Sequence, residues 1–302
     1  MKEKTKFDVI GFDDSFVSIA EKINESNYSY SNEILYAACD GIRILPPAKG
    51  ATSAECDRLS SVMLLIGRAY AASPERRKGA KKVNDGMITF FGGIANRIVS
   101  HPDYGAWREN IVEIAKQEYN YDGGQEDKQL LADSKDRVLE LNRMLLDAIG
   151  QFDGHESSED MKNCISFCTK LLHFMVPHIF YIKDSISWDA VWSLYGRQSN
   201  SELAYDERKL KIPRYAVGEA WNERYLHFQV GRRGADPRDS HEKEYWYHCR
   251  GCYVVSCLLK DVKLVSQTSG FNGIKNIYSR PRLVDSVLLH IHHDQEENTE
   301  QS

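Results

Sequence analysis

The chain has 302 residues, 42% of them hydrophobic, and a formal net charge of -5. This is enough apolar sequence to bury a core without disulfides, and seven cysteines, an odd number with no leader before them, favour reduced thiols in the cytoplasm. No segment approaches the roughly 20 apolar residues that cross a bilayer, and the negative charge neither supports nor excludes a nucleic-acid partner, because local basic patches can still hold phosphates.

Helical periodicity dominates the first half of the chain. Residues 1–50 alternate short apolar runs with polar and turn-forming residues, which predicts an irregular N-terminal arm. Apolar residues at three- and four-residue steps then predict a helical lobe over residues 51–150. Its helices are expected over Ser53 to Ala72, Val83 to Val99, Trp107 to Tyr119 and Lys135 to Ile149, with a loop from Tyr121 to Gln125.

The next segment, beginning at Ser157, is the most informative. Ser157 is a good capping residue, acidic residues follow it in the first turn, and apolar residues recur on one face until Pro177. The pattern predicts a helix from Ser157 to Met175 whose two cysteines, Cys164 and Cys168, face a core.

Polar residues mark the other face of this predicted helix. Ser166, Lys170 and His173 follow at steps of four and three, so they should form one polar row. A short extended run over residues 179–182 then leads to Asp184, which we expect to begin another helix that carries Trp188.

This segment resembles a known family. The resemblance rests on Thr169-Lys170-Leu171-Leu172-His173-Phe174, on Pro177, and on Phe180-Tyr181-Ile182-Lys183-Asp184-Ser185. These residues are similar to the corresponding part of the helix-hairpin-helix DNA glycosylase superfamily, particularly of bacterial proteins with an 8-oxoguanine DNA glycosylase-like fold (OGG fold). Residues 67–77 and 279–285 resemble, more loosely, recurring segments of the same bacterial proteins.

The resemblance implies roles for individual residues. An aspartate at the place of Asp184 caps a helix and faces the target nucleotide, where a carboxylate stabilises the oxocarbenium character of the sugar or activates water. Bifunctional members add a lysine nucleophile; Ser166 holds its usual position here, and Lys170 lies one turn later. We take Asp184 and Lys170 as candidate catalytic residues. Candidate substrate-binding residues are Ser166, His173, Ser185 and Trp188.

Each candidate also has a structural interpretation. Asp184 can be an ordinary N-cap, and Lys170 can be a solvated or ion-paired lysine on a helix face. A histidine such as His173 is more often hydrogen-bonded on a helix than catalytic. The glycine-rich hairpin that grips a DNA phosphate in the family is missing from the sequence, which favours the alternative of a catalytically inactive binding module.

The C-terminal half is less regular. Residues 196–213 predict a polar connector and residues 231–239 a charged loop, where Arg232 and Arg233, with Arg68 elsewhere, are candidate nucleic-acid contacts. From Tyr245 to Ser266, periodicity does not separate strand from buried helix. A last helix is expected over residues 282–290, followed by a disordered tail over 291–302.

A metal site is the third alternative. His248, Cys249 and Cys252 combine a Cys-x2-Cys pair with a flanking histidine. A second ligand pair at a suitable distance is missing, so buried thiols are the better interpretation, and we expect no metal and no cofactor.

Together these observations predict a cytoplasmic, mainly α, two-lobed protein whose glycosylase-like lobe spans residues 151–290. The resemblance implies that it recognises, and excises, a base in DNA or another nucleotide-containing substrate. Similar proteins are associated with bacterial anti-phage defence, which implies a partner protein of such a system. The competing hypothesis is a binding module for a partner protein or a modified nucleotide.

Overall fold

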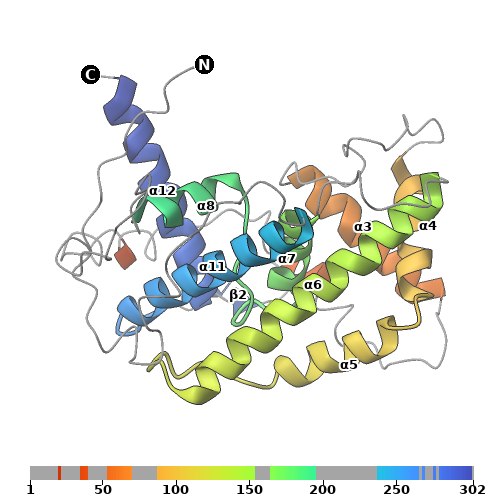
Figure 1. The fold of residues 1–302 in the computed structure, drawn as a ribbon, viewed down its shortest axis with the longest axis horizontal. Helices are drawn as coiled ribbons and strands as arrows, with labels where there is room; N and C mark the ends of the chain where they lie inside the picture. Colours follow the sequence, from red (N-terminus) through yellow and green to blue (C-terminus); the bar gives the residue numbers. More distant parts are fainter. Residues whose placement is uncertain are drawn as a thin grey trace.

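The computed structural model describes residues 20–21, 35–39, 53–69, 87–153, 164–194, 237–264, 267–268, 275–276 and 279–300. Within these ranges the protein is mainly α, as the sequence predicts (Figure 1). Its helices are α3 (Ser53–Ala69), α4 (Met87–Val99), α5 (Tyr104–Ile114), α6 (Gln125–Asp153), α7 (Ile165–Met175), α8 (Ser185–Leu194), α11 (Pro237–Leu258) and α12 (Arg280–Glu300).

Extended structure in the described residues is confined to two strands of two residues each. Strand β1 (Gln267–Thr268) pairs antiparallel with β2 (Lys275–Asn276). A pair this short makes no layer of the fold, so the extended element expected near the C-terminus is not confirmed. None of the helices in the described ranges has both the length and the apolar character that a membrane crossing requires.

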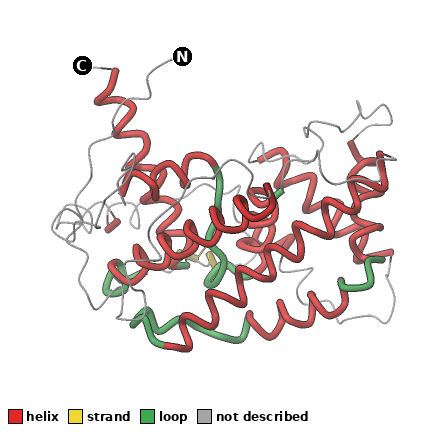
Figure 2. Tube along the Cα trace, viewed as in Figure 1, coloured by secondary structure: helices red, strands yellow, loops and turns green. Residues whose placement is uncertain are grey.

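Helix α6 is the longest helix in the described residues. It has 29 residues and contacts α4, α5, α7 and α11 (Figure 1). Its neighbours α3 and α4 pack on one another, and α3 also contacts α7. The loops drawn in Figure 2 join α5 to α6 and α7 to α8, so each of these pairs is linked by a short irregular segment.

The α5 to α6 connection is held by one buried carboxylate, Asp127. Its two oxygens accept backbone N–H groups of Asn120 and Asp122, at 2.9 and 3.2 Å, and the Tyr253 hydroxyl on α11 donates a further bond. These bonds replace partners that water would otherwise supply. The loop therefore docks on α11, and Tyr121 within it has a positive φ of 57°.

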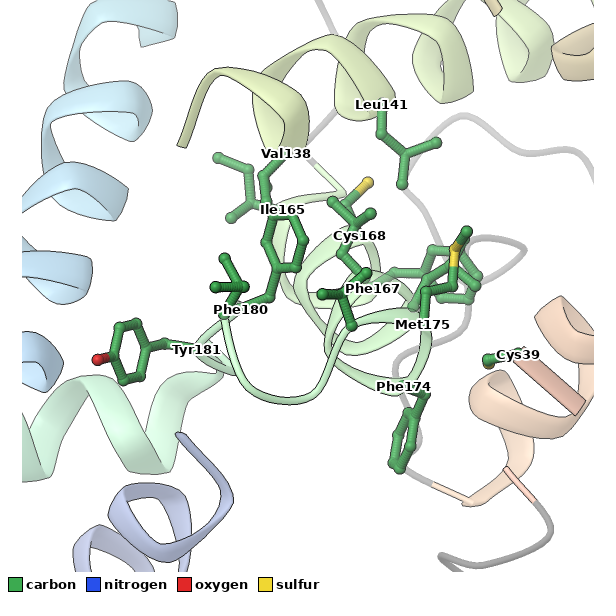
Figure 3. Close-up of a cluster of buried hydrophobic side chains, with 14 of the residues drawn as sticks. Cys39, Val138, Leu141, Ile165, Phe167, Cys168, Phe174, Met175, Phe180 and Tyr181 are labelled. Carbon is green, nitrogen blue, oxygen red and sulfur yellow. The ribbon is translucent and has the colours of Figure 1, made fainter. Parts of the chain in front are cut away.

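Helix α7 lies at the centre of the core. All of its residues except Ser166 are buried, and its apolar side chains pack in the core (Figure 3). Lys170 and His173, on the face predicted to be polar, are buried as well. Cys164 and Cys168 are fully buried, which confirms that they face the core. The buried polar side chains of this helix need partners within the protein, because water cannot supply them.

Helices α8, α11 and α12 complete the fold beside α7. Helix α12 contacts both α8 and α11, and α11 reaches back to α6 (Figure 1). The guanidinium of Arg280 donates to the backbone oxygens of Val262 and Lys260, each at 3.0 Å, and to that of Leu259. Arg280 thus satisfies carbonyls left open where α11 ends and fixes the start of α12 against it.

The structure corrects several predicted boundaries in the first two thirds of the chain. Helix α6 begins at Gln125, well before Lys135, and runs past the boundary predicted at residue 150. Residues 35–39, within the predicted irregular arm, are helical and pack in the core. Helix α7 begins at Ile165, after a non-helical Cys164 whose N–H donates to the Asn142 side chain at 2.6 Å. The predicted start at Ser157 lies outside the described residues.

The C-terminal third also differs from prediction. The segment from Tyr245 in which strand and helix were not separable is helix α11, which also takes in residues 237–239 of the predicted charged loop. Helix α12 continues to Glu300, through the tail predicted to be disordered. Glutamate and glutamine are good helix formers and extend a helix that burial has already nucleated. The predicted connector over 196–213 and residues 231–236 lie outside the described residues.

Candidate functional site

The candidate site is built where α7 turns back into α8. After Pro177 the chain runs through buried residues Ile179 to Ile182, and Thr169 on α7 ties this run down: its hydroxyl accepts the Lys183 N–H at 3.1 Å. This bond brings the start of α8 alongside the middle of α7, so residues distant in sequence face one another.

Asp184 caps α8. Its Oδ1 accepts the Ser187 N–H at 2.9 Å, and the Ser187 hydroxyl accepts the Asp184 N–H at 3.0 Å, a reciprocal capping box. Such bonds satisfy orphan N–H groups at the helix start, and the negative charge is favoured there by the helix dipole. The sequence predicted this cap.

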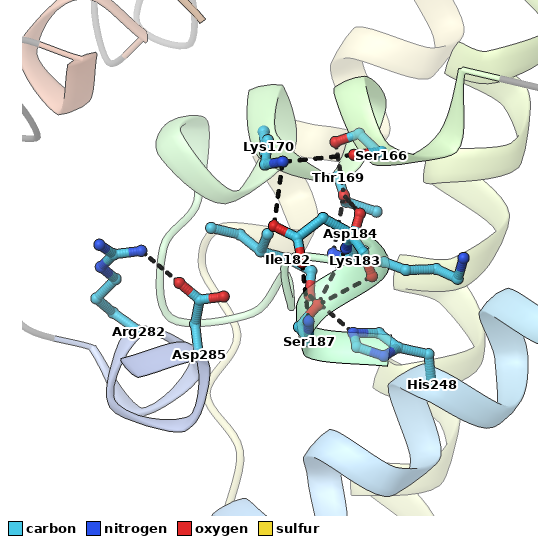
Figure 4. A network of polar contacts seen from close by, with 10 residues as sticks. All are labelled: Ser166, Thr169, Lys170, Ile182, Lys183, Asp184, Ser187, His248, Arg282 and Asp285. Atoms are coloured by element: carbon cyan, nitrogen blue, oxygen red, sulfur yellow. Dashed lines mark hydrogen bonds and ion pairs between the residues drawn. The ribbon is translucent and has the colours of Figure 1, made fainter. Parts of the chain in front are cut away.

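The second carboxylate oxygen of Asp184 pairs with Lys170. The Lys170 Nζ lies 3.3 Å from Asp184 Oδ2 and also donates to the Ser166 hydroxyl at 3.4 Å (Figure 4). The Lys170 side chain is 3% exposed, whereas that of Asp184 is 23% exposed. The lysine is therefore enclosed behind the carboxylate, and the carboxylate is the member of the pair that reaches solvent.

Electrostatics keep this carboxylate ionised. Burial by itself raises the pKa of Asp184, but the Lys170 ammonium and the bonds from Ser187 outweigh burial and lower it below its usual value. Asp184 is thus a fixed anion at neutral pH. It is suited to stabilise positive charge or to orient water, and not to donate a proton.

A second ion pair lies beside the first. Arg282 Nη1 on α12 is 2.5 Å from Asp285 Oδ2, and both side chains are almost fully buried (Figure 4). Burial raises the pKa of Asp285 to about 6; the charge of Asp184 acts in the same direction, and Arg282 and Lys170 oppose it. The two pairs therefore form one electrostatic group contributed by α7, α8 and α12.

His173 has a structural role in the described contacts. Its Nδ1 is 2.8 Å from the Phe180 carbonyl and its Nε2 is 2.9 Å from the Tyr36 hydroxyl. Burial lowers the pKa of His173 to about 3, so the ring is neutral; Nδ1–H donates to the carbonyl and Nε2 accepts from Tyr36. Both ring nitrogens are occupied and the side chain has no exposure, so we do not include His173 in the site.

The other predicted substrate-binding residues lie near Asp184. Ser166 bonds to Lys170, and Ser185 is exposed in the first turn of α8. Trp188 is half-buried one turn further on, with the Lys183 Nζ 5.3 Å and the His248 ring centroid 6.2 Å from its ring centroid. The structure brings these residues together around one end of α8, and their binding role stays a prediction.

The predicted nucleic-acid contacts are not part of this cluster. Arg68 is exposed in the last turn of α3, on a different element from the site. Arg232 and Arg233 lie outside the described residues. The described structure therefore gives the cluster no arginine from these three positions.

The histidine and cysteines of α11 that were considered as metal ligands have structural roles. His248 Nε2 is 2.7 Å from the Ile182 carbonyl, which only accepts, so His248 donates to it and helps position the run before Asp184. Burial raises the pKa of the Cys249 thiol to about 12 and holds that of Cys252 well above its usual value, so both stay protonated. Across the described residues, no three His, Cys, Asp or Glu side chains are grouped to hold a metal ion.

Sequence reasoning missed the α12 contribution. Arg282 and Asp285 lie about a hundred residues after Asp184, and periodicity along one helix does not reveal which other helix it meets. The one available signal was the loose resemblance of residues 279–285 to a recurring family segment. His248 was noted only as a metal ligand, and its bond to Ile182 depends on tertiary contact.

No family model, no curated protein and no solved structure matches this chain.

Proposed function

We propose that the chain is a DNA glycosylase-like protein that recognises a base in a nucleotide-containing substrate and hydrolyses its N-glycosidic bond. The observation that carries the proposal is the contact between Lys170 and Asp184. Two residues singled out by the family resemblance, one on α7 and one capping α8, meet at 3.3 Å, and the carboxylate is the more exposed of the two. Its defence role and any partner protein in such a system rest on the resemblance alone.

Asp184 supplies the chemistry in this proposal. When the bond between the base and the sugar C1′ breaks, the sugar develops oxocarbenium character, and a nearby ionised carboxylate stabilises it. Water adds its hydroxyl to C1′ and its proton goes to the departing base. Capping by Ser187 fixes the carboxylate in place, so little reorganisation is needed during the reaction.

Lys170 is a positioning residue in this mechanism. Its ammonium is buried and bound to both Asp184 and Ser166, which suits it to hold the carboxylate ionised and oriented. A lysine nucleophile would have to leave both partners to reach a sugar. The proposal is therefore a monofunctional glycosylase and not a lyase.

The second candidate is a binding module without catalysis. Both carboxylate oxygens of Asp184 already have protein partners, as expected of a residue that locks α7 to α8. In this alternative, the same cluster stabilises a fold that binds a partner protein or a modified nucleotide.

Base-release assays separate the two candidates. The wild-type chain and Asp184→Asn are incubated with single-stranded and duplex DNA carrying assorted lesions, and released bases are measured by chromatography. Asp133→Asn is a matched control, because Asp133 is a carboxylate on α6 bonded to Gln129 of its own helix. The proposal requires release by wild type and by the control, with a loss of at least about 100-fold in Asp184→Asn.

Borohydride trapping tests the role of Lys170. A Schiff base between Lys170 and the sugar would be reduced to a stable adduct, which Lys170→Gln would not form. We expect no adduct with wild type. An adduct that disappears in Lys170→Gln would replace the monofunctional mechanism with a lyase, and no release from any substrate would favour the binding module.

A further inference from the structure

The peptide group that joins Ile182 to Lys183 is held from both ends. Its N–H donates to the Thr169 hydroxyl on α7 at 3.1 Å, and its carbonyl accepts a bond from His248 Nε2 on α11 at 2.7 Å (Figure 4). The side chains of Thr169 and His248 are fully buried. We call these two bonds the peptide clamp, because two helices distant in sequence fix one peptide group of the connection between α7 and α8.

The clamp fixes an orientation as well as a position. A peptide group is planar, so holding both its N–H and its carbonyl fixes the direction of the whole plane. Without the two partners, the plane is free to rotate about the φ and ψ angles on either side of it. Buried backbone groups need partners within the protein, and Thr169 and His248 supply them. The chain therefore has one direction immediately before Asp184.

The clamped carbonyl also contacts the cap of α8. The Ser187 hydroxyl lies 3.4 Å from the Ile182 carbonyl oxygen and accepts the Asp184 N–H at 3.0 Å. The Ser187 N–H in turn donates to Asp184 Oδ1 at 2.9 Å. A shift of the Ile182 carbonyl would therefore change the backbone that leads to Asp184 and also the bonds that orient its carboxylate.

A second contact of His248 offers a competing account of its role. Its ring centroid lies 6.2 Å from that of Trp188, so the imidazole could act by packing alone. The two accounts need different chemistry. The clamp needs a hydrogen-bond donor at the place of Nε2, whereas packing on Trp188 needs a ring. Glutamine separates them, because its amide nitrogen reaches the place of Nε2 and it has no ring.

We propose that His248 is a positioning residue for the proposed hydrolysis: by holding the Ile182–Lys183 peptide against Thr169, it directs the Asp184 carboxylate toward the sugar. This inference rests on the proposed function for its catalytic meaning, and it assigns to α11 a part in the reaction. His248 does not touch the substrate in this account. Its loss should therefore lower kcat and leave KM little changed, because only the placement of the catalytic carboxylate is altered.

The first test is the kinetics of base release on the substrate that wild type cleaves best. In His248→Asn the amide nitrogen falls near the place of Nδ1 and does not reach Ile182, so kcat should fall about 10- to 100-fold. His248→Gln should recover most of this loss. His178→Asn is the matched control, because His178 Nε2 bonds to a different carbonyl, that of Gln117, at 3.0 Å. Its kcat should equal that of wild type, and circular dichroism checks that each variant is folded.

The other end of the clamp is tested by Thr169→Val, which keeps the shape of the side chain and removes its hydroxyl. We expect kcat to fall in Thr169→Val and to be retained in Thr169→Ser. Because both partners hold one peptide, the loss in Thr169→Val/His248→Asn should be smaller than the product of the two single losses. A loss equal to that product would contradict a shared peptide. The Thr169 variants also decide the question if His248→Asn does not fold.

Hydrogen exchange measured by NMR tests the positioning without any substrate. The Ser187 N–H is protected by its bond to Asp184 Oδ1. It should exchange about 2- to 10-fold faster in His248→Asn, and at the wild-type rate in His248→Gln. The N–H groups of Ala190 and Val191, later in α8, should change less, which separates a local loosening from a general loss of stability.

These outcomes separate the inference from the proposed function. If no protein releases a base but Ser187 exchanges faster only in His248→Asn, the glycosylase fails and the clamp stands. A loss that His248→Gln shares would assign the effect to packing on Trp188 and overturn the inference. A rise in KM with kcat unchanged, an equal loss in His178→Asn, or Ser187 exchange that no variant alters would overturn it as well.

Discussion

Removing the Lys170 ammonium gives the sharpest test of how the site is held. In Lys170→Met the side-chain volume is nearly kept, but the Asp184 carboxylate loses its cation while three quarters of its side chain stays buried. Breaking a fully buried pair on one side costs about 3–5 kcal/mol. Because Asp184 keeps some exposure and its bonds to Ser187, we expect a loss of about 2 kcal/mol in the free energy of unfolding near neutral pH.

A double-mutant cycle isolates the pair itself. Serine also caps helices, so Asp184→Ser removes the charge and keeps much of the cap. The double variant Lys170→Met/Asp184→Ser should be more stable than the sum of the single losses predicts, by about 1–2 kcal/mol, because no uncompensated charge remains. Urea unfolding followed by far-UV circular dichroism measures all four proteins.

The pH dependence of the same variant supplies a second check. In wild type the pKa of Asp184 is lowered, so its contribution to stability is present above the unfolded-state pKa and is lost as pH falls through the folded one. In Lys170→Met burial acts without the lysine, the pKa rises, and the destabilisation should shrink as the pH falls toward 4. Additivity within about 0.5 kcal/mol, or a loss independent of pH, would refute the reasoning.

Four further variants test other parts of the structure by denaturant unfolding and, for one of them, by hydrogen exchange. Arg282→Met should lower the free energy of unfolding by about 3 kcal/mol near neutral pH, because it leaves Asp285 buried and unpaired. The double variant Arg282→Met/Asp285→Leu should recover most of this loss. Equal losses in the two variants would contradict a buried ion pair. In wild type the pKa of Asp285 is raised to about 6, so its protonated form stabilises the folded state at low pH, and this stabilisation is lost as the pH rises from the unfolded-state pKa through about 6. In Asp285→Asn the free energy of unfolding should therefore vary less with pH over that window. An unchanged pH dependence would show that Asp285 is not the titrating group. Tyr253→Phe removes a bond to buried Asp127 and should cost about 1–3 kcal/mol, with hydrogen exchange accelerated first in residues 117–124; uniform acceleration would show that the loop does not depend on it.

Local patterns in the sequence predicted the fold class and several elements. Helix α3 begins at Ser53 as expected, and α4 ends at Val99, because regular apolar spacing and nearby breakers act over a few residues. The cap at Asp184 was also predictable, since capping depends on the residues that immediately follow. Both kinds of signal are local, and both are retained in the folded chain.

Features that depend on tertiary contact were not predictable. Lys170 looked like part of a polar helix face, yet every residue of α7 except Ser166 is buried, the lysine included. The Asn142 side chain takes the Cys164 N–H near the start of α7, and Arg280 bonds to carbonyls at the end of α11; neither partner is adjacent in sequence. One-dimensional periodicity shows that a residue needs a partner without showing which one it has.

The two candidate functions place different requirements on the contact between Lys170 and Asp184. A carboxylate stabilises an oxocarbenium ion through its negative field, but the Lys170 ammonium at 3.3 Å offsets part of that field. Catalysis therefore requires that a bound sugar approach the exposed edge of Asp184, away from Lys170, or that the lysine side chain turn aside toward Ser166. A binding module requires neither movement. Base release that survives Lys170→Met in folded protein would thus show that Asp184 acts by its own charge. The role of the buried lysine would then be to stabilise the fold.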